Sequence, residues 1–319
     1  MTAATPSRIG QTGLAGDAKS LFLKVWANEV MASYANKVTL KDRTRVRRIQ
    51  SGKSAQFPAI GLIGASYHTP GAVLTGQTVE HGEKVVTIDD LLISDVFLAS
   101  IDEAMNHYDV RSEYTKNMGI ALAQTFDRNI ISLAVKSAIA GTSGAVADQG
   151  DAARVALGSV TPSVADIITG IYDAGVTMDE NNVPEDERFV IVPPQVYSDL
   201  SQNDKLVSKD FNMSNGDYSK RLVMEVGGFQ VVKSNNFAID HTSVTRHPDT
   251  SDSKYAVDAT GYKALCMHPH AIGTVELLGM ATEAEYEISR QGWLAVSKMA
   301  IGHGVLRPDC IIALDGAVS

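Results

Sequence analysis

The first part of the chain repeats apolar residues at helical spacing. Phe22, Trp26, Val30 and Tyr34 recur at every fourth position within residues 17–37. This spacing places them on one face of a helix and predicts an apolar stripe. Such a stripe must pack against another surface, and the pattern is compatible either with the body of the same subunit or with a neighbouring subunit.

A second helical pattern is much longer. Apolar residues advance by four through residues 109–140, and Gly141 follows as a natural helix stop. A helix of roughly 30 residues spans about 45 Å, which suits a structural strut better than a small enzyme domain. A third, amphipathic helix follows Thr161 and Pro162, which we expect at its N-cap and first helical position. A capping box at Ser100 and Glu103 predicts a short helix before the long one.

Residues 54–90 have the pattern of a hairpin with little core of its own. Two segments of strand character, AQFPAIG (55–61) and EKVVTIDDLL (83–92), enclose a stretch rich in glycine and threonine with few large apolar residues. An isolated hairpin of this kind is marginally stable in water. We therefore expect it to be stabilised by lying on another surface.

The rest of the chain predicts a second α/β lobe and then long strands. Residues 158–275 combine the amphipathic helix with several short apolar segments, so we expect helix, strands and intervening loops there, with residues 201–219 as loop. Residues 276–319 are expected to form long strands that return to the first part of the molecule. The segments of strand character are RFVIV (188–192), GFQVV (228–232), YKALCM (262–267), AIGTVELL (271–278) and CIIAL (310–314).

Composition is that of a soluble globular protein. The chain is 44% hydrophobic and 20% charged, with no apolar run long enough for a membrane span. Cys266 and Cys310 are expected as buried, unpaired thiols from a reducing compartment. The net charge of −9 argues against tight binding of DNA, although an acidic lining suits a container in which packed DNA must move.

Known catalytic and cofactor motifs are missing or broken. The sequence Ser51-Gly52-Lys53-Ser54 resembles the end of a phosphate-binding loop, but Arg47 stands where that loop needs a glycine. His268, His270 and His303 lack the spacing of a metal site, so hydrogen-bonded or surface histidines are the favoured interpretation. Asp89 and Asp90 are adjacent, and strand geometry points them to opposite faces. We expect no enzyme activity, cofactor or metal.

Longer runs of the sequence do resemble a known family. The match is strongest at AMNHYDVRSEYT (104–115), which is too long and irregular to follow from helical periodicity. The runs LFLKVWANEV (21–30), RRIQSGKSAQFPAIG (47–61), HAIGTVEL (270–277) and KMAIGHGVLRP (298–308) keep the same order and spacing. The chain resembles the major capsid proteins of T-seven-like short-tailed bacteriophages, most weakly between about 141 and 262.

The resemblance implies an α+β fold of the Hong Kong 97-like capsid type. It implies that hexamers and pentamers close into an icosahedral shell around double-stranded DNA, with weak non-specific DNA contact. A scaffolding protein, a portal protein at one vertex and assembly in the host bacterial cytoplasm are implied too. The implied parts are an N-terminal arm (1–50), an E-loop (51–90), a P-domain with spine helix (91–157), an A-domain (158–275) and P-domain return strands (276–319).

Two patterns of charge at every second residue suggest how subunits could be aligned. We call them the arginine comb (Arg43, Arg45 and Arg47) and the glutamate comb (Glu283, Glu285 and Glu287). For the arginine comb, a solvated strand face is the simplest interpretation, a contact with an acidic surface of a neighbouring subunit comes next, and a DNA contact ranks third. The combs could face each other between subunits, or between arm and P-domain. The expected inter-subunit contacts are Trp26, Arg43, Arg45, Arg47, Tyr67, His68, Glu283, Glu285 and Glu287.

Two other functions stay open at this point. A cellular nanocompartment shell of the same fold would need an inner surface that binds cargo. A soluble cytoplasmic enzyme is disfavoured because the apolar and glycine-rich arms come without any recognisable site.

Overall fold

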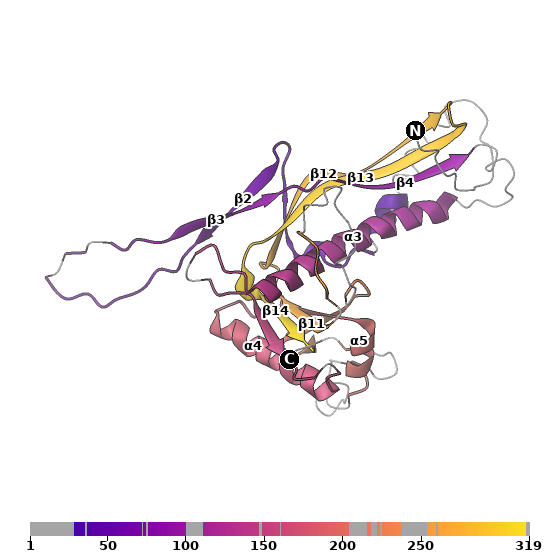
Figure 1. Cartoon of the computed structure of the whole chain (residues 1–319). Helices are drawn as coiled ribbons and strands as arrows, with labels where there is room; N and C mark the ends of the chain where they lie inside the picture. Colours follow the sequence, from indigo (N-terminus) through magenta and orange to yellow (C-terminus); the bar gives the residue numbers. More distant parts are fainter. Residues whose placement is uncertain are drawn as a thin grey trace.

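A body of two β-sheets and the long helix α3 carries a hairpin that projects far from it (Figure 1). The computed structural model of the chain describes residues 29–35, 37–71, 73–74, 76–99, 111–146, 149–159, 161–203, 216–217, 222–223, 225–237, 254–259 and 261–316. Trp26, the short helix expected at Ser100 and most of the loop expected at 201–219 lie outside these residues. None of the helices in the described part of the chain is long and apolar enough to cross a membrane.

The first sheet has four strands in the order β1-β12-β13-β4. Strand β13 pairs antiparallel with β12 on one side and with β4 on the other, while β1 runs parallel to the first residues of β12. Helix α3 packs along this sheet (Figure 1). The strands are β1 (Arg45–Arg48), β4 (Leu91–Ala99), β12 (Ile272–Glu287) and β13 (Gly292–Val305).

Helix α3 (Arg111–Ala140) confirms the long helix expected from the sequence. Its stripe of Met118, Leu122, Phe126 and Ile130 is buried, since residues four apart share one helix face. Gly141 follows in a left-handed conformation with φ of 56°, and the next amide donates to the Ser137 carbonyl oxygen at 3.1 Å. This is the C-terminal stop that the glycine predicted.

The described end of the first helix packs on the same subunit. Residues 29–35 are helical, and both Val30 and Tyr34 are buried against α3. A Cβ at Gly119 would lie 2.6 Å from the Val30 carbonyl oxygen, so the missing side chain lets the two helices cross closely. For these residues the apolar stripe serves the subunit's own core.

The second sheet has six strands in the order β5-β14-β11-β6-β10-β9 and is flanked by α4 and α5 (Figure 1). The predicted strands at RFVIV, GFQVV and YKALCM are confirmed as β6, β10 and β11. The two cysteines are buried and unpaired as expected, and burial raises the pKa of both thiols. The elements are β5 (Ala153–Ala156), α4 (Val164–Glu180), β6 (Phe189–Val192), α5 (Pro194–Leu200), β9 (Glu225–Val226), β10 (Phe229–Lys233), β11 (Tyr262–Met267) and β14 (Ile311–Asp315).

The N-cap of α4 differs from the one expected. Ser163, not Thr161, caps the helix: its hydroxyl accepts the Asp166 amide at 3.3 Å, and the Asp166 carboxylate accepts the Ser163 amide at 2.9 Å. Pro162 therefore precedes the cap instead of opening the helix. The reciprocal capping box satisfies two amides at once, which Thr161 could not do because Val164, three residues later, has no side-chain acceptor.

The last strand lies in a different sheet from the one expected. β14 does not return with β12 and β13; it lies between β5 and β11 in the second sheet. All five of its residues are buried. A strand covered on both faces is apolar without alternation, and IIAL fits that position. Short elements complete the description: η1 (Lys41–Arg43), η2 (Pro308–Cys310), β7 (Gly216–Asp217) and β8 (Leu222–Val223).

Candidate subunit interface

The projecting hairpin exposes apolar side chains that no part of the described chain covers. Strands β2 (Ser54–Ile60) and β3 (His81–Thr87) pair antiparallel, and residues 61–80 extend beyond them without a sheet partner. Six large apolar residues of the hairpin are between 65% and 106% exposed, and an exposed apolar patch of this kind marks an interaction surface. They are Ile60, Leu62, Ile63, Tyr67, Val73 and Leu74.

The base of the hairpin is fixed firmly to the first sheet. Ala55, Phe57 and Val86 form a small buried cluster with Val275 and Leu306. The hairpin backbone also lies directly on β13, because a Cβ at Gly302 would come within 2.1 Å of the Thr87 carbonyl oxygen. The base of the hairpin is therefore packed on the body of the subunit, and only its outer part depends on another surface for its stability.

Asp89 anchors the end of the hairpin to a second segment. Its amide donates to the Ile301 carbonyl oxygen at 3.0 Å. Its carboxylate is 2.8 Å from Lys254 Nζ and also accepts a hydrogen bond from the Tyr255 hydroxyl. The Asp89 carboxylate is thus occupied by structural contacts.

The arginine comb is only partly the extended row that was expected. Arg43 lies in the 3₁₀ turn η1, and its Nη1 donates to Gln230 Oε1 at 2.8 Å. Arg47 donates to the Gln56 carbonyl oxygen. The single arginine face is therefore wrong for Arg43, because the turn interrupts the strand before β1. Arg45 is exposed and has no carboxylate partner among the described residues.

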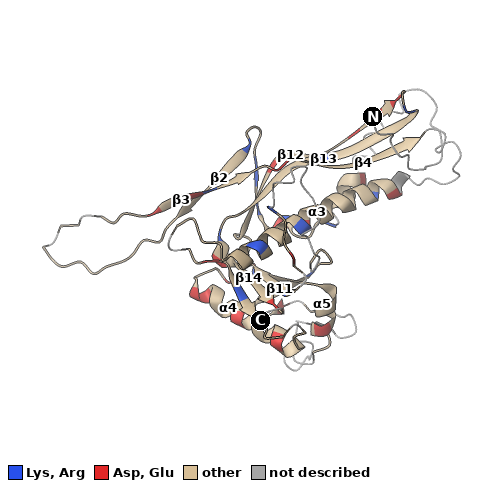
Figure 2. Cartoon of the chain, viewed as in Figure 1, with Lys and Arg blue, Asp and Glu red and all other residues tan. Residues whose placement is uncertain are grey.

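The glutamate comb lies at the far end of β12, where Figure 2 shows acidic residues in red. Glu283 pairs with Lys298 at 2.7 Å and Glu287 with Arg290 at 3.1 Å. Glu285 is exposed and, within the described chain, lacks an ion pair. Since β1 pairs with Gly273–Glu276 at the other end of β12, the two combs do not meet within one subunit. The hypothesis of a contact between arm and P-domain inside one chain is therefore wrong.

Tyr67 and His68 both lie exposed on the outer part of the hairpin, where a neighbouring surface can reach them. Trp26 is outside the described residues. The exposed leucines and isoleucines beside Tyr67 were not singled out from the sequence, although apolar residues scattered in a glycine-rich run were the available indication.

A basic pocket that the sequence did not reveal lies at the root of the hairpin. Its cavity of about 190 Å³ is lined by Arg45, residues 57–60, Lys84, Gln149, His270, Leu306 and Arg307. These residues come from six separate segments, so no local pattern could have predicted the pocket. Burial and the positive charges of Arg45 and Arg307 lower the pKa of His270.

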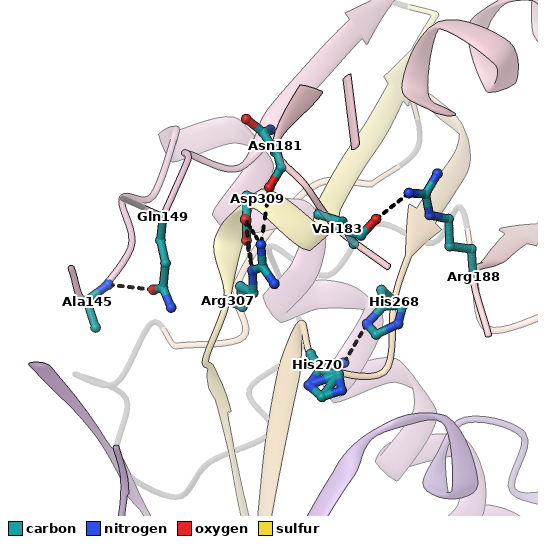
Figure 3. Close-up of polar contacts among 9 residues, drawn as sticks. All are labelled: Ala145, Gln149, Asn181, Val183, Arg188, His268, His270, Arg307 and Asp309. Atoms are coloured by element: carbon teal, nitrogen blue, oxygen red, sulfur yellow. Dashed lines mark hydrogen bonds and ion pairs between the residues drawn. The ribbon is translucent and has the colours of Figure 1, made fainter. Parts of the chain in front are cut away.

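Arg307 is held in place by a buried carboxylate. Its Nε lies 3.0 and 2.9 Å from the two Asp309 oxygens, and its Nη2 donates to the Asn181 carbonyl oxygen at 3.2 Å (Figure 3). Behind it, the His270 amide donates to His268 Nδ1 at 3.2 Å, and the two rings stack. Burial, with the neighbouring His270, lowers the pKa of His268 to about 4.

The histidines do not assemble into a metal site. His303 is fully buried away from the stacked pair, with Nδ1 3.0 Å from Thr274 Oγ1 and its ring edge-on to Phe126. Burial, followed by the charge of Lys254, lowers the pKa of His303 to about 3. Among the described residues no group of three or more His, Cys, Asp or Glu side chains could hold a metal ion.

Comparison with known proteins agrees with these features. Residues 56–315 match the Gp10A-like family, described as "Major capsid protein". The major capsid protein of Escherichia phage T7 is 34% identical, with 92% of this chain and 91% of that protein aligned. The major capsid protein of Enterobacteria phage T3 is 32% identical, with 96% and 94% aligned.

A solved structure shows the same likeness in three dimensions. The capsid structure of the cyanophage P-SCSP1u superposes with a TM-score of 0.77 at 38% identity, covering 99% of both chains. The expected α+β fold of the Hong Kong 97-like capsid type is confirmed, and the chain is a structural protein of a phage capsid shell. By sequence and by structure, the chain belongs to the Gp10A-like family of major capsid proteins.

Proposed function

We propose that copies of this chain assemble as hexamers and pentamers into a closed icosahedral shell around packaged double-stranded DNA. Family membership supports the shell, and the projecting hairpin is the observation that supports assembly through it. An arm that exposes Tyr67, Leu62 and Ile63 is stabilised only when a neighbouring subunit covers it. The chain acts through its interfaces and not through catalysis.

Many moderate contacts would hold such a shell together. Obligate interfaces bury roughly 2,000–5,000 Å², and a subunit that donates its arm to one neighbour also receives an arm from another. Contacts repeated around closed rings act together, so the lattice is much more stable than any single contact. The expected parts, with residues 51–90 as E-loop and 91–157 carrying the spine helix, belong to this proposal.

Other partners of the shell follow from the same proposal. A scaffolding protein guides assembly in the host bacterial cytoplasm, and a portal protein occupies one vertex. The packaged DNA makes only weak, non-specific contacts, because the net charge of −9 repels phosphates at most of the surface. An inner surface of this kind encloses DNA without holding it.

Expression of the chain with and without a co-expressed scaffolding protein tests the proposal. Sedimentation and negative-stain microscopy should show uniform shells, or free hexamers and pentamers, in at least one of the two samples. A stable monomer in both samples, with no higher assembly at any concentration, would contradict it.

A further inference from the structure

The basic pocket has cations that the subunit itself does not neutralise. Of its three permanent cations, Arg307 is paired with the buried Asp309. Lys84 donates only to the Ser143 carbonyl oxygen at 3.3 Å, and Arg45 has no carboxylate partner among the described residues. No carboxylate lines the cavity. The pocket therefore keeps two positive charges that no carboxylate of the described chain neutralises.

The end of the first sheet that lies away from the basic pocket has an excess of negative charge. Asp95 on β4 and Glu283 on β12 both pair across Val296 of β13, and Glu285 follows two positions after Glu283. Directly paired residues, and residues two apart on a strand, point to the same side of a sheet. These three carboxylates form what we call the acidic face. Lys298 neutralises Glu283, whereas Asp95 and Glu285 have no cation partner among the described residues.

The two sites cannot meet within one subunit. Arg45 lies opposite Gly273 on β12, and Glu285 is twelve residues further along the same strand. At about 3.3 Å per residue this separation is about 40 Å. Among the described residues, each copy thus carries two cations without an ion-pair partner at one end and two carboxylates without one at the other. Such an arrangement suits a head-to-tail contact that repeats from one copy to the next.

We infer that the basic pocket receives a carboxylate from the acidic face of a second copy of this chain. The inference rests on the proposed function, since it names one contact within the assembled shell. Arg45 and Lys84 provide the charge, while Arg307, held by Asp309, lines the same pocket. A DNA phosphate is the competing occupant, and the net charge of −9 disfavours it.

Cross-linking of assembled shells tests the contact directly. A carbodiimide joins an amine to a carboxylate without a spacer, so it should couple Lys84 to Asp95, Glu283 or Glu285, and mass spectrometry would identify the joined peptides. The separation within one chain means that such a link must connect two copies. Normal shells in which Lys84 is coupled to none of these residues would overturn the inference and leave the proposed function standing. If the wild-type chain forms no shells, the proposed function fails instead.

Charge reversal provides an independent test. Reversal of the pocket (R45E with K84E), or of the acidic face (D95K with E285K), should raise the subunit concentration needed for assembly by about tenfold or more, because every copy loses the contact. Combining all four substitutions should restore assembly to near the wild-type concentration. The control K37E with K53E makes the same charge change at exposed lysines outside the pocket and should assemble normally.

Two results would overturn the inference. One is a combined variant that assembles no better than either pair alone. The other is a pocket variant, R45E with K84E, that assembles like the wild type but retains less DNA, which would assign the pocket to phosphate. Circular dichroism of each unassembled variant shows whether the subunit still folds, so that a loss of assembly is ascribed to the contact only when folding is intact.

Discussion

Asp127 of α3 is a buried carboxyl group that joins two parts of the chain. It accepts the Thr39 amide at 3.1 Å and the Leu40 amide at 3.2 Å, which ties the segment after the first helix to the long helix. Burial raises its pKa to about 6, and the hydrogen bonds from these amides only partly oppose that rise. Relative to the unfolded chain, the folded subunit therefore favours the protonated form of this residue.

This shift gives a testable pH dependence. An aspartate whose folded pKa lies above its unfolded value of about 3.8 contributes stability below pH 3.8, and loses it as the pH rises through 6. D127N keeps an oxygen acceptor but does not titrate. The free energy of unfolding of D127N should therefore rise relative to wild type between pH 4 and pH 7, by at most about 3 kcal/mol. Urea unfolding of the unassembled subunit measures this, with the exposed D95N as control; parallel pH profiles for wild type and D127N would contradict it.

Gly302 allows the base of the hairpin to pack closely against β13. A Cβ there would lie 2.1 Å from the Thr87 carbonyl oxygen and 2.8 Å from Ile88 Cα, both of them backbone atoms that cannot rotate away. We predict that G302A displaces the base of the hairpin and destabilises the subunit by about 1–3 kcal/mol. G279A is the matched control on the neighbouring strand, because its nearest contact would be Glu276 Oε1 at 3.8 Å. Equal melting temperatures for the two variants would refute the prediction.

At the level of elements, the base of the hairpin contributes to the folding of the subunit, whereas its outer part contributes to assembly. Gly61 and Glu80 still pair, with an amide-to-carbonyl distance of 2.9 Å, but the residues between them add nothing to the subunit's core. Replacing residues 62–79 with Asn-Gly would close β2 and β3 with a tight turn. We expect the trimmed subunit to melt like the wild type yet to form no shells when sedimented. Shells of normal size from the trimmed chain would show that the outer arm is dispensable.

The elements that could be predicted from sequence are those with a local cause. The stripe of α3 and its stop at Gly141 depend on spacing alone, and so does the coreless hairpin. The cap of α4 was misplaced by two residues because Thr161-Pro162 and Ser163 with Asp166 are both recognised capping patterns, and only the reciprocal hydrogen bonds distinguish them. The basic pocket could not be predicted, since its residues are brought together by β1, the hairpin and the turn before β12.

On the scale of the whole molecule, β14, the last strand of the described chain, completes the sheet of the second lobe. The sequence indicated a lobe over residues 158–275 because helix and strand patterns end near there. β14, which begins at Ile311, was assigned elsewhere, since a short apolar segment carries no information about which distant strand it pairs with. Its position between β5 and β11 means that the second sheet is complete only after the chain has passed through β12 and β13 of the first sheet.

This topology predicts unusual protection close to the C-terminus. Terminal segments normally fray and exchange their amide hydrogens quickly, but β14 is buried throughout and pairs on both sides. We expect the amides of residues 311–315 to exchange as slowly as those of β6 and β11, because the three strands open only as one cooperative unit. Hydrogen exchange with mass spectrometry on the unassembled subunit measures this, with the edge strand β4 as the faster comparison. Rapid exchange of β14 beside a protected β11 would show that the last strand is not part of that unit.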